Sequence, residues 1–267
     1  MGRLRSNGWR AGFLSLLLLL VQLPGSARAQ ENLPPRLFLP LIASSPRCPA
    51  TTGESYAAIT VEPPPTDRPA AEHADLNLAL RSYASTDGFL GLVDYGGATD
   101  PLAPQLYRLF SDERTGEFTS LHQVYDWNWA CNCRGNPLTW PPVTLAELAT
   151  SPGELIRVPD SGYTIGSGYE VLVLYATPER ITLKYTRNDN VVHGFTLHLE
   201  GVCIDPHLLA LYQASNAAGR GSLPALRAGQ AIGRAEDEDI GVAIRDSGAF
   251  LDPRSRKDWW RGRQKDD

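Results

Sequence analysis

The sequence predicts a mainly β fold, a sandwich or barrel with one or two short helices. Short runs rich in β-branched and aromatic residues recur between residues 119 and 245, and turn residues separate them. The clearest runs are YEVLVLY at 169–175 and RITLKYT at 180–186, which flank Thr177-Pro178. Repeated short strands with intervening turns are typical of β-sandwiches and barrels.

The N-terminal residues 1–29 have the pattern of a secretory signal peptide. Arg3, Arg5 and Arg10 accompany the apolar run GFLSLLLLLV, and Ala27-Arg28-Ala29 is a small-x-small cleavage site. The run is shorter than the about 20 residues that a membrane span needs. We therefore expect a secreted, extracellular or cell-surface protein with no stable membrane insertion after cleavage. A retained N-terminal anchor is the alternative.

Four segments follow the signal peptide. The Pro-rich residues 30–71 predict a semi-extended linker. Residues 72–142 predict an α+β segment with a loop rich in Trp and Cys, and residues 143–254 predict a β domain. Residues 255–267 predict a basic, solvated tail.

Each element follows from its own pattern. Within 70–85 the apolar spacing fits either a helix or a strand, and a short apolar run follows at 89–95. Residues 119–129 alternate between apolar and polar. The run FTLHLEGVCI at 195–204 continues the sheet, and 230–233 and 240–245 close it. Residues 206–218 predict a helix of about three turns, because Pro206 begins the segment and Gly219 ends it.

Charge and motifs exclude several function classes. A formal net charge of −5 argues against nucleic acid as a partner, since phosphate binding needs a basic face. The chain has no Gly-x-Ser-x-Gly motif, no phosphate-binding loop and no Cys nucleophile with a spaced His. No cofactor is predicted, and the oligomeric state is not predicted either.

The four cysteines fit an oxidising compartment and up to two disulfides. Side chains two residues apart on an extended segment point the same way, so a bond between Cys131 and Cys133 is expected to strain its geometry. We therefore expect both to pair outward, one with Cys203 and the other with Cys48. A zinc site at the Cys-x-Cys pair is the alternative.

The segment YDWNWACNCRGNPLTW at 125–140 is the most unusual in composition. Aromatic faces beside amide, acidic and basic side chains suit sugar rings, through stacking and hydrogen bonds to hydroxyl groups. The alternative is a disulfide-tethered loop whose tryptophans fill the core. The candidate ligand-binding residues are Tyr125, Asp126, Trp127, Trp129, Arg134 and Trp140.

The stretches at 143–162 and 226–254 contain VTLAELATSPGELIRVPDSG and LRAGQAIG, and in register they resemble the lysostaphin-type peptidoglycan metalloendopeptidases. VTLAELATSPGELIRVPDSG at 143–162 aligns without gaps with the family's first motif, H-x-G-x-D-Φ-A-A-P-x-G-T-P-V-Y-A-P-A-D-G. LRAGQAIG at 226–233, Ile244-Arg245, Gly248 and Asp252-Pro253 follow the family's closing segment. The resemblance implies the family's β scaffold, a duplicated-hybrid barrel-sandwich, over residues 143–254.

The resemblance fails at the catalytic positions. Where the family places its zinc ligands and catalytic His, this chain has Val143, Glu147, Asp239 and Gly241. Val and Gly offer no lone pair to a metal, and one carboxylate cannot fix zinc. No metal is therefore predicted, and the resemblance implies a scaffold without its catalyst.

These observations together predict a secreted, non-catalytic β protein. We expect it to bind an extracellular glycan or cell-wall polymer such as peptidoglycan. One alternative is a divergent metal-dependent cell-wall endopeptidase that uses His198, Glu147 and Asp239. A structural cell-surface protein is the second alternative.

Overall fold

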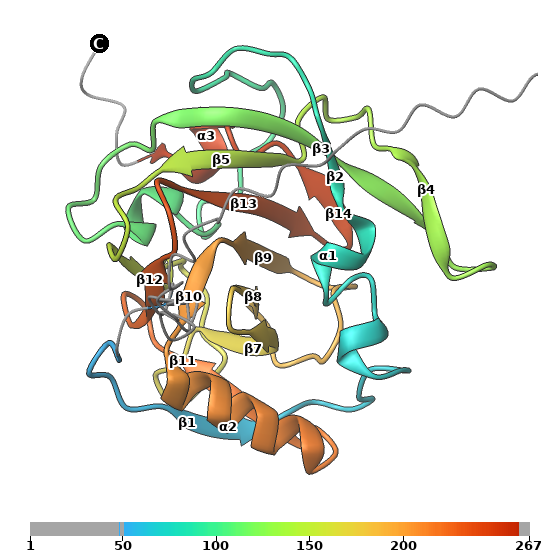
Figure 1. Ribbon diagram of the computed structural model, residues 1–267, viewed down its shortest axis with the longest axis vertical. Helices are drawn as coiled ribbons and strands as arrows, with labels where there is room; N and C mark the ends of the chain where they lie inside the picture. Colours follow the sequence, from blue (N-terminus) through green and yellow to red (C-terminus); the bar gives the residue numbers. More distant parts are fainter. Residues whose placement is uncertain (1–47, 49–50, 262–267) are drawn as a thin grey trace, which may run out of the picture. The chain divides into compact units, whose positions relative to one another are not determined.

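Antiparallel strands dominate the part of the chain that the computed structural model describes, Cys48 and residues 51–261 (Figure 1). The predicted mainly β class with few short helices is confirmed. The predicted signal peptide, residues 30–47 and 49–50 of the predicted linker and residues 262–267 lie outside the described residues. In the described part of the chain, no helix has both the length and the apolar character that crossing a membrane requires.

The larger sheet gathers strands from nearly the whole described chain. Its strands run, in spatial order, β1 (Ala57–Thr60), β11 (Ser222–Leu226), β7 (Val171–Thr177), β8 (Arg180–Lys184), β9 (Phe195–Glu200), β13 (Asp239–Asp246), β5 (Leu145–Ala149), β3 (Phe118–Asn128) and β2 (Tyr83–Ser85). In addition, β14 (Ala249–Leu251) pairs with β13, and β4 (Cys133–Pro137) pairs with β3. Each of these pairings is antiparallel.

A second, smaller sheet consists of β10 (Val202–Ile204), β12 (Ala231–Ala235) and β6 (Leu155–Arg157). The predicted strand at 195–204 is therefore split between two sheets. Gly201 makes the break, since its φ of 71° lies in the left-handed region that favours glycine. Gly233 allows β12 to approach β10, because a Cβ atom there would collide with the carbonyl oxygen of Cys203.

The helices are short and lie outside the sheets. The prediction for 206–218 is confirmed by α2 (Pro206–Ala217), which lies beside β1 and β11 (Figure 1). The Asp205 carboxylate caps α2 by accepting a hydrogen bond from the backbone N–H of His207 at 2.8 Å. The ambiguous stretch 70–85 contains both kinds of structure, a 3-10 turn η1 (Ala70–Glu72), helix α1 (Leu78–Arg81) and strand β2. The remaining elements are η2 (Leu106–Leu109) and α3 (Arg256–Trp259).

Part of the predicted basic tail folds against the core. Trp259 and Trp260 are 2% and 0% exposed, and their indole N–H groups donate to the carbonyl oxygens of Asp252 and Pro253. Residues 255–261 are therefore not a solvated end, because burying two indole rings outweighs the charges around them. By contrast, the apolar run at 89–95 contains no strand, and Phe89 and Leu90 in it are exposed.

Strand pairing also crosses the predicted segment boundaries. Strand β1 lies within the residues expected as linker, and it pairs with β11. Strand β3 precedes residue 143, and it pairs with β5, which follows that residue. Hydrogen bonding thus joins residues 57–60 and 118–128 to the larger sheet, which also contains most of the strands between residues 145 and 246.

The predicted disulfide connectivity is wrong. The bonds join Cys48 to Cys203 and Cys131 to Cys133. The prediction assumed an extended backbone at 131–133, but residues 129–132 form a turn in which Asn132 has a φ of 50°. This turn brings the Cα atoms of Cys131 and Cys133 to 5.2 Å, a separation that a disulfide spans readily.

The Cys48–Cys203 disulfide is expected to stabilise the fold more than the Cys131–Cys133 disulfide does. Cys48–Cys203 spans 155 residues, and chain entropy assigns a loop of that length about 5 kcal/mol. We predict that the free energy of unfolding of the double variant Cys48→Ser/Cys203→Ala is lower than that of the wild type by about 5 kcal/mol. Guanidinium titrations without reductant measure this difference. The matched double variant Cys131→Ser/Cys133→Ser is expected to lose less than about 2 kcal/mol. Equal losses in both variants would contradict this assignment.

Candidate functional site

Five residues in cross-strand register form a polar row across the larger sheet. Glu200 on β9 lies opposite Arg180 on β8 and opposite Gly241 on β13, and Gly241 lies opposite Glu147 on β5. Glu147 in turn lies opposite Ser120 on β3. Residues directly opposite one another in antiparallel strands share a face of the sheet. We call Arg180, Glu200, Gly241, Glu147 and Ser120 the polar row.

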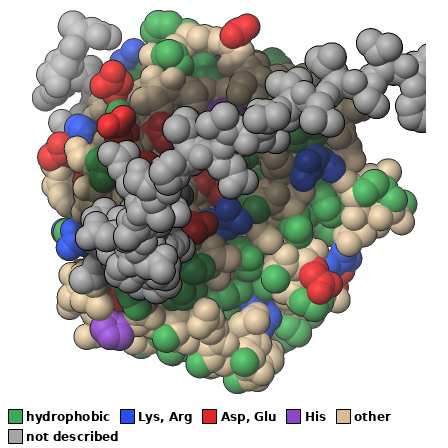
Figure 2. Space-filling view, viewed as in Figure 1, with side chains coloured by type: hydrophobic (Ala, Val, Ile, Leu, Met, Phe, Trp, Pro, Cys, Tyr) green, Lys and Arg blue, Asp and Glu red, His purple; other side chains and the backbone are tan. Residues whose placement is uncertain are grey.

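Gly241 keeps the centre of the polar row open. A Cβ atom at this position would lie 3.3 Å from Cβ of Glu200 and 3.6 Å from Cδ2 of Leu145. A side chain here would therefore occupy the space between the two acidic neighbours, Glu200 and Glu147. On the face viewed in Figure 2, acidic side chains gather toward the centre beside a basic one.

Burial perturbs the acids of this region. Glu200 is 9% exposed, and its Oε2 lies 3.0 Å from Nε of Arg180. Burial raises the pKa of Glu200 to about 7, because the nearby Arg180 charge offsets only part of the desolvation. Burial, and then the charge of Glu147, also raise the pKa of Asp239, the first residue of β13. Glu200 therefore exchanges its proton near neutral pH.

Sequence reasoning missed two members of this region, Ser120 and His122. The Ser120 hydroxyl donates to Glu147 and lies 2.7 Å from Nε2 of His122, which is itself 3.5 Å from Oε1 of Glu147. Tyr83 packs edge-on against the His122 ring at 4.9 Å. Ser120 contacts both the His and the acid, so His122 does not lie between them as it would in a hydrolytic triad. Alternation along β3 places both residues on one face, but only the pairing with β5 reveals Glu147 as their neighbour.

The three weak catalytic candidates do not form one site. The charge of Glu147 contributes to the raised pKa of Asp239, but His198 lies in the next row of the sheet, opposite Ala243. His198 is 1% exposed, its Nδ1 lies 3.0 Å from Oγ1 of Thr182, and burial holds its pKa well below the ordinary value. Among the described residues, no group of three or more His, Cys, Asp or Glu side chains is placed to hold a metal ion.

A buried ion cluster covers the sheet face next to His198. Arg245 on β13 and Arg81 on α1 both bond Oδ1 of Asp75, at 2.8 and 2.7 Å. Both arginines are 4% exposed. Burial opposes ionisation of Asp75, but the charges of Arg245 and Arg81 outweigh it and hold the pKa of that carboxyl below its usual range. The cluster thus attaches the segment around α1 to the central strand.

The Trp-rich segment is a hairpin of β3 and β4 that extends beyond the rest of the sheet (Figure 1). Trp127 is 9% exposed and Trp129 is 42% exposed, so only the first of them fits the core-filling alternative. Tyr125 is half-buried, with the Arg134 guanidinium 5.6 Å from its ring, and Asp126 is exposed. These five candidates lie on the hairpin, whereas Trp140 lines a separate pocket.

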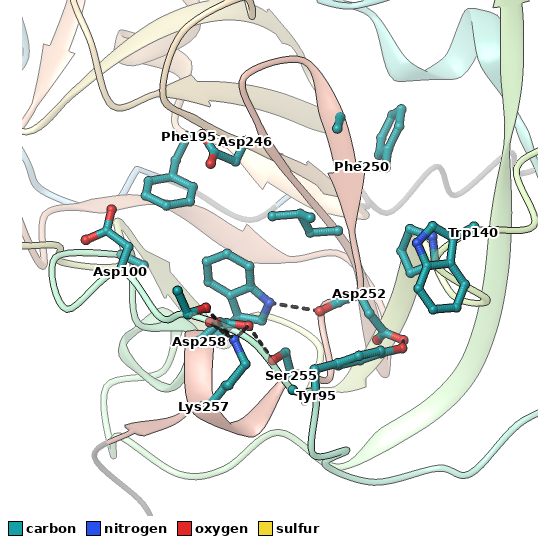
Figure 3. Close-up of a pocket in the computed structure, with 17 residues that line it drawn as sticks. Tyr95, Asp100, Trp140, Phe195, Asp246, Phe250, Asp252, Ser255, Lys257 and Asp258 are labelled. Carbon is teal, nitrogen blue, oxygen red and sulfur yellow. Dashed lines mark hydrogen bonds and ion pairs between the residues drawn. The ribbon is translucent and has the colours of Figure 1, made fainter.

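That pocket has a volume of about 460 Å³ and lies among the 95–100 loop, the β13–β14 hairpin and α3 (Figure 3). We call it the Trp140 pocket. Its walls combine aromatic rings with carboxylates. Of the residues that line it, only Trp140 was a candidate from the sequence. The aromatic members are Tyr95, Trp140, Phe195, Phe250 and Trp259, and the acidic members are Asp100, Asp246, Asp252 and Asp258.

Hydrogen bonds fix one wall of the Trp140 pocket. The Tyr95 hydroxyl donates to Oδ2 of Asp252 at 2.7 Å, and Arg254 pairs with the same carboxylate at 2.8 Å. Burial, and then the bond to Asp252, raise the pKa of Tyr95 to about 12, so its hydroxyl stays protonated. On another wall, Lys257 pairs with Asp258 at 2.8 Å. These groups are held in place before any ligand arrives.

Comparisons with protein-family models, with curated proteins and with solved structures found no match to this chain.

The raised pKa of Glu200 predicts a specific pH dependence of stability. The folded pKa of about 7 exceeds the ordinary value of 4.5, so between these values the folded state binds more protons than the unfolded state. The associated stability is fully present below about pH 4.5 and is lost as pH rises through 7. Relative to Glu200→Gln, the wild type is expected to lose up to about 3 kcal/mol over this range. Urea titrations across pH measure this difference. If the free energy of unfolding changes with pH in the same way in both proteins, the raised pKa of Glu200 is refuted.

Proposed function

We propose that this chain is a secreted, non-catalytic β protein that binds an extracellular glycan, such as peptidoglycan, in the Trp140 pocket. One observation carries the proposal. The Trp140 side chain is 80% exposed at a pocket of about 460 Å³, a size that admits a small sugar unit. An indole ring left in water beside a prepared pocket offers a large apolar face to a ligand.

The other pocket walls complement a sugar. The CH face of a pyranose stacks on an aromatic ring, and its hydroxyl groups donate to carboxylates. Tyr95 supplies a second aromatic ring, while Asp100 and Asp246 supply acceptors on the walls away from Trp140 (Figure 3). One ring-stacking element with several polar groups around it is the arrangement that fixes both the position and the orientation of a small polar ligand.

The charge of the Trp140 pocket restricts the kinds of glycan that it can bind. Asp252 pairs with Arg254 and Asp258 pairs with Lys257, so ion pairs neutralise two of the four carboxylates. The carboxylates of Asp100 and Asp246 leave a negative potential in the Trp140 pocket. The pocket therefore favours neutral or amino sugars and disfavours polymers with acidic groups on each unit.

The resemblance to lysostaphin-type enzymes supports a cell-wall polymer. Residues that share one zinc ion must lie close together, and the aligned positions Glu147 and Gly241 are direct cross-strand neighbours in this fold. We therefore extend the proposal to a barrel-sandwich scaffold of that kind over residues 143–254. Val143 is 1% exposed and Gly241 has no side chain, so neither supplies a metal ligand. Two disulfides support an oxidising compartment.

Substituting the exposed indole is expected to weaken binding selectively. We predict that the wild type sediments with insoluble peptidoglycan or chitin, and that Trp140→Ala weakens this binding about tenfold, the equivalent of about 1.4 kcal/mol of lost stacking. Trp129→Ala is the matched control, because it removes an exposed indole that does not line the pocket. Quantitative pull-down isotherms measure both effects.

Two outcomes would remove this proposal. The first is that the wild type binds none of a panel of neutral glycans, amino glycans and cell-wall polymers. The second is that the purified protein releases soluble fragments from peptidoglycan, which would establish a hydrolase instead.

A further inference from the structure

The two disulfides differ in their surroundings. Cys203 is 3% exposed, and its bond to Cys48 ties the smaller sheet to a residue 155 positions away. Cys131 and Cys133 are both exposed, at the turn that joins β3 to β4. Exposed disulfides are more easily reduced than buried structural ones, because an attacking thiolate reaches their sulfur atoms.

The turn that carries Cys131 and Cys133 is held independently of the sulfur bond. Asn132, between them, has a φ of 50°, and its Oδ1 accepts hydrogen bonds from Nε1 of Trp127 at 3.3 Å and from Nη1 of Arg68 at 3.1 Å. These bonds do not need the disulfide, so the two thiols stay close after reduction. A cysteine pair kept close in both states can be reduced and re-formed repeatedly.

Reduction of this bond also leaves the rest of the fold intact. The bond closes a loop of only three residues, so it removes little entropy from the unfolded chain. Strand β4 pairs with β3 alone, outside the main path of the sheet, and its residues are mostly exposed. The Cys131–Cys133 bond is therefore poorly explained as a stabilising element.

A partly exposed aromatic ring lies beside the exposed disulfide. The Trp129 ring, 42% exposed, forms part of the same turn. The guanidinium of Arg68 lies 4.8 Å from its centroid, and His73 packs edge-on at 5.2 Å. A rigid, half-exposed indole next to a disulfide can hold an extended polypeptide segment while its cysteines react.

We propose that Cys131–Cys133 is a thiol–disulfide exchange site whose substrate is a cysteine pair in an unfolded polypeptide. One substrate thiolate attacks either sulfur atom, and the S–S bond breaks to give a mixed disulfide and a free thiolate. The second substrate thiolate then attacks the substrate sulfur of the mixed disulfide and displaces the sulfur of Cys131 or Cys133, which completes a substrate disulfide. Two electrons and two protons pass from the substrate dithiol to Cys131 and Cys133. Oxidised glutathione then accepts the two electrons and two protons from the Cys131/Cys133 dithiol, is released as two molecules of reduced glutathione, and restores the Cys131–Cys133 disulfide.

Equilibration with glutathione tests the redox half of this proposal. The full chain is incubated in graded ratios of reduced to oxidised glutathione, quenched with acid, alkylated and mapped by mass spectrometry. Cys131–Cys133 is expected to become half-reduced at a ratio at least tenfold lower than Cys48–Cys203. Reduction of both bonds at the same ratio, or of Cys48–Cys203 first, would overturn the assignment.

Oxidation of reduced, unfolded ribonuclease A tests the substrate half. The wild type is expected to accelerate disulfide formation in ribonuclease with glutathione present, and to form a trappable mixed disulfide through Cys131 or Cys133. Cys131→Ser/Cys133→Ser is expected to lose both activities while its circular dichroism spectrum stays unchanged. Equal rates for this variant and the wild type would overturn the proposal. A loss in Trp140→Ala would also overturn it, because the Trp140 pocket is separate from this turn.

Discussion

The arrangement of the sheet depends on how one buried guanidinium is neutralised. Arg245 lies on the central strand β13 and is almost fully buried, and an unpaired charge in that position would cost several kcal/mol. Asp75 neutralises it at 2.8 Å and bonds Arg81 as well. Because Asp75 and Arg81 belong to the segment around α1, this one cluster fixes that segment over the sheet. His198 and Thr182 lie beneath it, where Thr182 donates to the carbonyl oxygen of Leu76.

Strand β13 connects the polar row with the Trp140 pocket. Near its first residue, Gly241 leaves an opening between Glu147 and Glu200. At its last residue, Asp246 lines the pocket, and β14 continues the pocket wall. Gly241 and its acidic neighbours Glu147 and Glu200 thus lie toward the first residue of β13, and the exposed aromatic surface lies at the other end of this strand.

Local signals in the sequence predicted local structure well. The Asp205-Pro206 start of α2 and the β-branched runs of β7 and β8 depend on neighbouring residues alone, so these predictions are confirmed. The errors arose where an unexpected local turn or contacts between distant residues decide the structure. The left-handed turn at Asn132 joins two cysteines that an extended segment would keep apart, and the core recruits Trp259 and Trp260 from an apparently solvated tail. The Trp140 pocket gathers residues from several separate segments, so only Trp140 itself was a candidate.

Glycan binding at the Trp140 pocket can be tested by observing the indole N–H groups of the protein while a ligand is added. The chain has six Trp residues, so its indole region in a two-dimensional ¹H–¹⁵N spectrum is simple to assign by single substitutions. On titration with a soluble chitin or peptidoglycan oligosaccharide, we expect the Trp140 resonance to shift progressively while the Trp129 and Trp260 resonances stay in place. Shifts confined to Trp129, or no indole shift at saturating oligosaccharide, would contradict it.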